Sequence, residues 1–239
     1  MFDFAPRLKM KNEPVWQFAF DCLQQNIPVM LLAVAESAGA SPGKAGFKMA
    51  IASNGERRGT IGGGIMEVNW VGQSLKSLGE GSAAMEVRRV FHSRETPHEQ
   101  SGLICSGSQT ILAVPFDVRA KECIGEILTT FEQKKFGRLS IGVSGISLEQ
   151  NRLHDEDFSF TYKSEKDWKY KENLGVLDTV YIVGSGHVGL ALSRVMSTLD
   201  FRAVVIDDRA AVETFTKNTF AHEKIFSVYD AIGDIIRDG

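Results

Sequence analysis

One segment in the last quarter of the chain constrains the fold more than any other. An apolar run at 180–183 is followed by Gly184, Gly186 and Gly189, then by apolar residues at helical spacing and a second apolar run at 202–206. In such a turn the first glycine permits a tight bend, the second lets a ligand approach the backbone, and the third lets the helix pack on the strand. The segment therefore predicts a strand, a glycine turn, a helix and a parallel strand.

Asp207 stands at the end of the second apolar run, 23 residues after Gly184. In Rossmann-type domains an acidic side chain at this place accepts hydrogen bonds from the ribose of a dinucleotide. The context predicts a Rossmann-like parallel-sheet domain whose turn binds a nucleotide or a phosphate ester. The alternative is a turn that only joins strand to helix. Arg209 leaves NAD and NADP both open, because a guanidinium can meet a 2′-phosphate.

The stretch from Asp178 to Gly239 is short for a full dinucleotide-binding fold. It has 62 residues, about half of what two mononucleotide-binding halves require. We therefore expect an incomplete parallel sheet. An unpaired sheet edge favours association with a second copy, so a homodimer is the expected oligomeric state.

The residues before this domain predict a mixed α/β domain. Asn54-Gly55 is the favoured pair for a tight hairpin, in which both residues take positive φ. The segment 163–175 is rich in lysine, glutamate and aspartate, which predicts a solvated connector between a first domain at 1–163 and a second at 176–239. Periodicity predicts helices at 13–25, 65–78 (with Val68, Val71, Leu75 and Leu78 inward) and 119–135, and strands at 29–34, 47–52, 57–61, 85–91, 109–116, 139–143, 145–148 and 158–162.

Charge and cysteine content narrow the class of protein. The formal charge is −3, without a basic cluster dense enough to follow a phosphate backbone, which argues against nucleic acid as the main partner. The sequence lacks an apolar run of roughly 18 to 20 residues and a signal-peptide pattern, so we expect a cytoplasmic protein. The three cysteines form no CxxC pair, which argues against a disulfide framework or a structural metal.

Two glycine-bearing loops of the first domain are candidate anion sites. In the first, Ser41 and Lys44 can donate to an anion, although the loop lacks the first glycine and the magnesium-binding hydroxyl of a P-loop. A plain turn at Pro42-Gly43 is the alternative.

The second loop has three consecutive glycines, Gly62, Gly63 and Gly64, directly before a helix. Consecutive N–H groups there can form an anion-binding concavity that the helix dipole reinforces. Glu67 follows, and two interpretations stay open for it. It either caps the first turn of the helix or makes a polar contact to a bound heterocycle.

Cys105 lies among small residues just before a predicted strand, whereas Cys22 and Cys123 fall on predicted helices. A thiol in a glycine-bearing turn, with its pKa lowered by nearby N–H groups, can serve as a soft metal ligand or a sulfur acceptor. An inert buried cysteine is the alternative.

Four ordered motifs resemble the XdhC/CoxI family: the loop at 37–49, Gly59-Thr-Ile-Gly-Gly-Gly-Ile-Met-Glu67, Gly102-Leu-Ile-Cys-Ser-Gly107, and the turn at 184–189. That family consists of accessory proteins for xanthine dehydrogenase and related molybdenum hydroxylases. Its members hold the molybdenum cofactor, support its sulfuration by a cysteine desulfurase and pass it to the apoenzyme. The resemblance implies a cofactor chaperone more than an enzyme, and no catalytic residue.

Carried over by position, the resemblance implies cofactor-binding roles for Cys105, as a contact to molybdenum, for Gly62, Gly63, Gly64 and Glu67, and for Gly184, Gly186 and Gly189. Ser106 replaces the first glycine of the family's usual CGG element. The expected cofactor is molybdopterin, and three ligands stay open for the Rossmann turn: NAD(P), another nucleotide, or the phosphate of the cofactor itself. The alternatives are an NAD(P)-dependent oxidoreductase, for which we find no catalytic pair, and a non-catalytic scaffold for a desulfurase and a hydroxylase.

Overall fold

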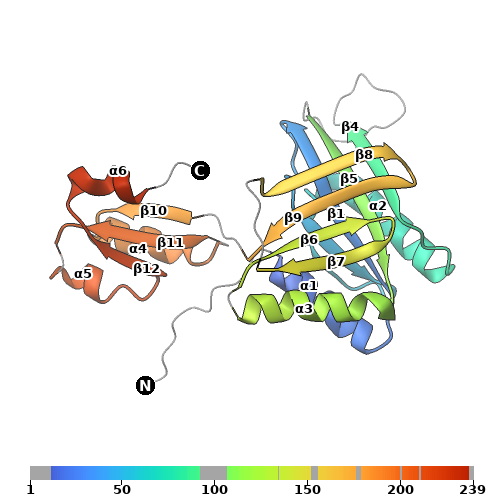
Figure 1. Cartoon of the computed structure of the whole chain (residues 1–239), viewed down its shortest axis with the longest axis horizontal. Coiled ribbons are helices and arrows are strands. Elements are labelled where there is room, and N and C mark those ends of the chain that lie inside the picture. Colours follow the sequence, from blue (N-terminus) through green and yellow to red (C-terminus); the bar gives the residue numbers. More distant parts are fainter. Residues whose placement is uncertain are drawn as a thin grey trace. The chain divides into compact units, whose positions relative to one another are not determined.

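The computed structural model describes residues 12–91, 107–133, 135–151, 156–175, 179–199, 201–209 and 211–236. The described residues fall into two compact units (Figure 1). The N-terminal unit runs from Asn12 to Gly175, and the C-terminal unit lies within 176–239.

A five-stranded antiparallel sheet in the order β3-β2-β1-β5-β4 forms the base of the N-terminal unit. The first seven residues of its central strand are all buried, as expected of an apolar run with both sheet faces covered. The strands are β1 (Val29–Gly39), β2 (Lys48–Ala52), β3 (Arg57–Gly59), β4 (Glu86–Phe91) and β5 (Gly107–Phe116).

The predicted hairpin joins β2 to β3, but its turn differs from the expected one. Only Gly55 has positive φ, at 93°, and its N–H donates to the carbonyl of Ala52 at 2.9 Å. Asn54 itself does not have positive φ. It stabilises the loop through its side chain, because its Oδ1 accepts from the N–H of Glu56 at 3.0 Å. The loop is therefore a three-residue turn with the glycine in the left-handed position.

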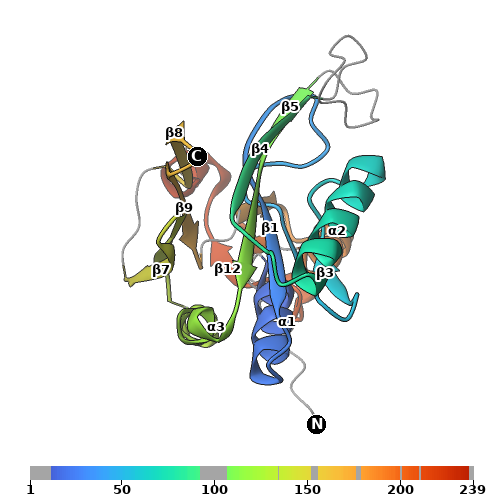
Figure 2. The ribbon, with the colours of Figure 1, turned by 90° about the vertical axis from the view of Figure 1, so that its right-hand side faces the viewer.

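Helices cover both faces of this sheet. Helix α2 (Gly64–Gly79) lies on one face, and helix α1 (Glu13–Gln24) lies on the other. Helix α3 (Lys121–Glu132), which follows the 3₁₀ turn η1 (Val118–Ala120), packs against α1. Figure 2 shows α2 and α3 on opposite sides of β4 and β5. The buried stripe of α2 consists of Met66, Trp70, Val71 and Ser74, whereas Val68, which the periodicity placed inward, is 65% exposed.

A second, four-stranded antiparallel sheet completes the N-terminal unit in the order β7-β6-β9-β8. Its strands are β6 (Gly137–Gly142), β7 (Gly145–Gln150), β8 (Phe158–Ser164) and β9 (Asp167–Leu174). The connector expected at 163–175 was therefore wrong. Trp168, Tyr170, Glu172 and Leu174 alternate along β9 and are buried. The charged residues that alternate with these four led to the prediction of a solvated connector, although such residues lie only on the opposite face of the strand.

A buried ion pair joins the two sheets. The ammonium of Lys48, on β2, contacts the carboxylate of Glu172, on β9, and also donates to the carbonyl of Gly46 at 3.1 Å. The hydroxyl of Tyr170 donates to the same carboxylate at 2.8 Å. Lys48 and Glu172 have exposed fractions of 1% and 2%, so each charge depends on the other for compensation.

The C-terminal unit contains a three-stranded parallel sheet in the order β10-β11-β12. Strand β10 (Thr179–Val183), helix α4 (His187–Met196) and strand β11 (Arg202–Asp207) follow the predicted strand, turn, helix and strand. The unit also has α5 (Glu213–Thr216), β12 (Glu223–Phe226), η2 (Tyr229–Ala231) and α6 (Ile232–Ile235). The predicted fold class, a mixed α/β unit followed by a Rossmann-like parallel-sheet unit, is confirmed.

The helices are short throughout, and α2 is the longest with 16 residues. Within the described ranges, none has both the length and the hydropathy that a membrane crossing requires.

Candidate functional site

Three segments meet at one end of the five-stranded sheet, and we call this place the glycine corner: 38–44, 60–64 and 107–109. Their backbones are in direct contact. A Cβ on Gly62 would lie 2.6 Å from the N of Gly43, and a Cβ on Gly107 would lie 2.6 Å from the O of Ala38. A Cβ on Gly43 would overlap the O of Ile61. Glycine is needed at these positions because the loops leave no room for a side chain.

Gln109 and Ser41 fasten the glycine corner from inside. The Nε2 of Gln109, whose side chain is 1% exposed, donates to the O of Ile61 at 2.9 Å. The hydroxyl of Ser41 donates to the O of Gly43 at 3.1 Å, and Ser41 is 5% exposed. The sequence predicted Ser41 as a donor to an anion, whereas in the structure its hydroxyl holds its own loop.

Glu67 closes the triple-glycine turn with one carboxylate oxygen. Its Oε2 accepts from the hydroxyl of Thr60 at 2.6 Å and from the N–H groups of Ile61 and Gly63 at 2.9 and 3.0 Å. The N–H of Gly62 donates to the Thr60 hydroxyl at 3.1 Å. Of the two interpretations of Glu67, the structure shows the capping role directly, because the carboxylate accepts from the turn before α2.

The same contacts leave part of the turn available to a ligand. The Oε1 of Glu67 has no hydrogen-bond partner among the described residues. Gly64, the first residue of α2, is exposed, and the N–H groups of a helix's first turn have no acceptor within the helix. Lys44 is exposed as well. The N–H groups of this first turn and the ammonium of Lys44 can receive an anion, whereas the N–H groups of Ile61 and Gly63 are already used and the Oε1 of Glu67 can only accept a hydrogen bond.

The cysteine on which the sequence placed most weight, Cys105, lies outside the described residues. The other two thiols are poor nucleophiles. Burial, and after it the charge of Glu126, raises the pKa of Cys123 to about 12, and burial raises the pKa of Cys22. Since the thiolate is the reactive form, neither is suited to sulfur chemistry at neutral pH.

The C-terminal glycine turn has the predicted geometry at each of its three glycines. Gly184 has φ of 97°, in the region that favours glycine. A Cβ on Gly189 would overlap the O of Gly184, so only glycine lets α4 pack on the turn. A Cβ on Gly186 would meet nothing within 4 Å, so the backbone borders open space there, as the approach of a ligand requires.

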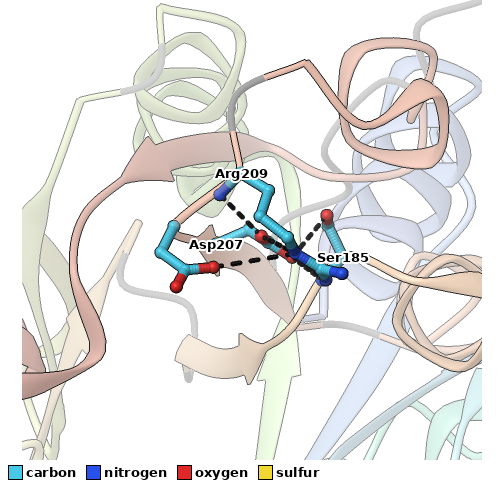
Figure 3. A network of polar contacts seen from close by, with 4 residues as sticks. Ser185, Asp207 and Arg209 are labelled. Carbon is cyan, nitrogen blue, oxygen red and sulfur yellow. Dashed lines mark hydrogen bonds and ion pairs between the residues drawn. The ribbon is translucent and has the colours of Figure 1, made fainter.

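Asp207 is not available as the sequence predicted. It is fully buried, and its Oδ2 accepts from the N–H and the hydroxyl of Ser185 at 2.5 and 2.6 Å. Arg209 donates to both carboxylate oxygens, through Nε at 3.0 Å and Nη2 at 3.1 Å (Figure 3). The pKa of Asp207 lies far below its ordinary value, chiefly because of the contact with Arg209. The hydrogen bonds from Ser185 lower the pKa further, whereas burial raises it. A ribose would have to displace these partners.

Sequence reasoning missed Thr60, Gln109 and Ser185, which hold these turns. Each left a faint signal, because each is the polar residue beside or between the glycines of a motif: Thr60 after Gly59, Gln109 after Gly107-Ser108, and Ser185 between two glycines. Within the described part of the chain, histidine, cysteine and acidic side chains form no group able to hold a metal ion.

Comparison with known proteins supports this architecture. A crystallised xanthine dehydrogenase from Bacillus halodurans has a similar fold, with a TM-score of 0.53 at 17% identity over 91% of this chain and 71% of that one. The likeness concerns the fold alone. The comparison with curated protein sequences gives no match.

A family model, the XdhC and CoxI family, matches residues 22–90. This range contains the loop with Ser41 and Lys44 and the triple-glycine turn with Glu67, which are two of the three segments of the glycine corner. Residues 22–90 thus carry the sequence pattern of the XdhC and CoxI family, and the resemblance that the ordered motifs predicted is confirmed there.

Proposed function

We propose that this chain is an accessory protein of a xanthine dehydrogenase-type molybdenum hydroxylase and that its N-terminal unit binds the molybdenum cofactor for delivery to that enzyme. The observation that carries the proposal is the glycine corner, of which two segments lie in the range matched by the XdhC and CoxI family. The similar fold from Bacillus halodurans, described as a xanthine dehydrogenase, supports the same assignment.

The residues of the glycine corner fit a ligand that has both a phosphate and a heterocycle with N–H groups. The first turn of α2, starting at the exposed Gly64, suits a phosphate, and the exposed ammonium of Lys44 adds positive charge. The Oε1 of Glu67 suits the N–H groups of a pterin, because an ionised carboxylate only accepts. Glu67 then holds the turn with one oxygen and recognises the ligand with the other.

Cys105 is the proposed contact to molybdenum or to its sulfur. It precedes Gly107, a residue of the glycine corner, by two positions in the sequence. A thiolate is both a soft metal ligand and an acceptor of sulfur from a cysteine desulfurase, so this residue is the proposed link to sulfuration.

The test is the molybdopterin content of the purified chain. We expect the full chain, expressed in a host that makes the cofactor, to copurify with molybdopterin. Cys105→Ala is expected to lower the molybdenum and labile sulfur that it carries. Cys123→Ala is the matched control, because the pKa of that thiol is about 12, and it should change neither. Parent protein without molybdopterin would refute cofactor binding.

A second experiment separates a chaperone from a scaffold. Coexpression with a xanthine dehydrogenase-type enzyme and a cysteine desulfurase is expected to raise the active fraction of that enzyme. If the chain captures both partners but never carries molybdopterin, it is a scaffold and the cofactor proposal is wrong.

A further inference from the structure

Asp207, at the position that normally contacts a ribose, already has all its hydrogen-bond partners inside the C-terminal unit. Asp207 has no exposed surface, and its two oxygens together accept five hydrogen bonds from Ser185 and Arg209. A hydrogen bond to a neutral ribose hydroxyl contributes too little to displace a guanidinium held by a bidentate, charge-assisted contact. Selection of a free ribose by Asp207, the pattern of NAD sites, is therefore disfavoured.

At the position where Asp207 was expected to accept from a ribose, Arg209 offers hydrogen-bond donors instead. Its Nε and Nη2 bond to Asp207, whereas its Nη1 has no hydrogen-bond partner in the described part of the chain. The side chain is 57% exposed. A guanidinium fixed along one edge keeps the other edge preorganised for a planar, two-point contact, which phosphate oxygens match.

Exposed apolar side chains lie at the carboxyl ends of the parallel strands beside this guanidinium. Val183 ends β10 and is 49% exposed, and Phe226 ends β12 beside Asp207 and is 61% exposed. Tyr229 is 44% exposed and begins η2, three residues after Phe226 ends β12. Ligands of open α/β sheets bind at the carboxyl ends of the strands, and apolar side chains there suit a flat base.

We propose that the C-terminal unit binds an adenosine that carries a 2′-phosphate, as in NADP, with the outward edge of Arg209 on that phosphate and Phe226 and Tyr229 beside the base. The open space over Gly186 then receives the pyrophosphate at the start of α4. This proposal concerns the C-terminal unit alone and goes beyond the accessory function, which a different assay tests.

Asp208 opposes such a ligand. Its carboxylate lies 3.6 Å from the Nε of Arg209 and is 37% exposed. A second negative charge beside the guanidinium weakens the attraction for a phosphate dianion. The affinity for NADP should therefore be moderate and should rise when this charge is removed.

Isothermal titration of the full chain with NADP, NAD and adenosine 2′,5′-bisphosphate tests the proposal. We expect NADP to bind at least about tenfold more tightly than NAD, and the bisphosphate to compete with NADP. Asp208→Asn is expected to tighten NADP binding. Arg209→Ala is expected to remove the preference, while Lys217→Ala, which removes an exposed cation directly after α5 of the same unit, should leave it unchanged.

Gly186→Ala tests the turn without disturbing the fold, since its φ of −61° suits alanine and its Cβ meets no neighbour. We expect weaker binding of NADP with an unchanged melting temperature. Equal affinity for NAD and NADP, a preference for NAD, no binding of either, or competition by inorganic phosphate as effective as that of the bisphosphate would each overturn the proposal.

Discussion

At the scale of single residues, two carboxylates close the two principal glycine turns of the chain. Glu67 accepts from Thr60, Ile61 and Gly63 in the N-terminal unit, and Asp207 accepts from Ser185 and Arg209 in the C-terminal unit. Each supplies internally the negative charge that such a turn attracts. The hydrogen bonds to these carboxylates thereby stabilise the conformations of the glycine turns without a bound ligand.

Glu67→Ala is expected to destabilise the N-terminal unit by about 1–3 kcal/mol, because two N–H groups and one hydroxyl lose their acceptor. Glu122→Ala, at an exposed glutamate in the first turn of α3, is the matched control and should stay within about 0.5 kcal/mol of the parent. Urea denaturation measures both. Equal stability of the two variants would show that Glu67 does not hold the turn.

The depressed pKa of Asp207 predicts a pH dependence. Its folded-state pKa lies below the ordinary value of about 3.9, so the carboxylate stabilises the fold fully above that pH and progressively less as the pH falls toward the folded pKa. Asp207→Asn should therefore lower the melting temperature of the C-terminal unit at pH 7. The gap to the parent should narrow below about pH 4. A gap that stays constant across an acid titration would contradict this origin.

At the scale of elements, the junction between β10 and α4 depends on which glycine is replaced. Gly189→Ala is expected to destabilise the C-terminal unit by more than about 1 kcal/mol, because the new Cβ overlaps the carbonyl of Gly184 and neither backbone can yield cheaply. Gly186→Ala, three residues earlier, adds the same methyl group to open space. Thermal unfolding of the two variants should separate them clearly, and similar melting temperatures would show that the close packing is not needed.

Most elements could be predicted from the sequence where one physical signal dominated. The turn at Gly184 sits between two apolar runs, and the hairpin at Asn54-Gly55 has a strong local preference, so both connections are where they were expected. The strand β9 was missed because its buried face includes Glu172, a charged residue that is stable there only through Lys48, 124 positions away. A pairing over that distance leaves no local pattern.

The candidate sites were predicted in outline and not in detail for the same reason. For Glu67 the motif left two interpretations open, and the cap is the one that depends only on neighbouring residues. Arg209 donates to the carboxylate of Asp207, so this acidic residue is not available to a ribose as the sequence predicted. That contact depends on the rotamer of Arg209, which sequence spacing does not determine. Gln109 reaches Ile61, 48 positions earlier, and so becomes visible only when the strands are placed.

At the scale of the whole molecule, each unit has its own buried core. In the N-terminal unit one cluster includes Met30, Leu32, Ile51, Trp70 and Ile111. In the C-terminal unit a smaller cluster consists of Ile182, Ala203, Val205 and Phe215. A substitution that weakens one core is therefore expected to act on the stability of that unit, since cooperative unfolding follows contiguous packed groups.

Hydrogen exchange of the full chain, read by mass spectrometry, tests this expectation with one variant in each unit. Lys48→Met leaves the buried carboxylate of Glu172 without its counter-charge, which costs about 3–5 kcal/mol, and should speed exchange within 12–175. Gly189→Ala should speed exchange within 179–236. The double substitution Lys48→Met with Glu172→Leu should restore much of the protection, because it removes both buried charges. If either single variant accelerates exchange equally in both units, the chain unfolds as one cooperative body and the two cores do not act separately.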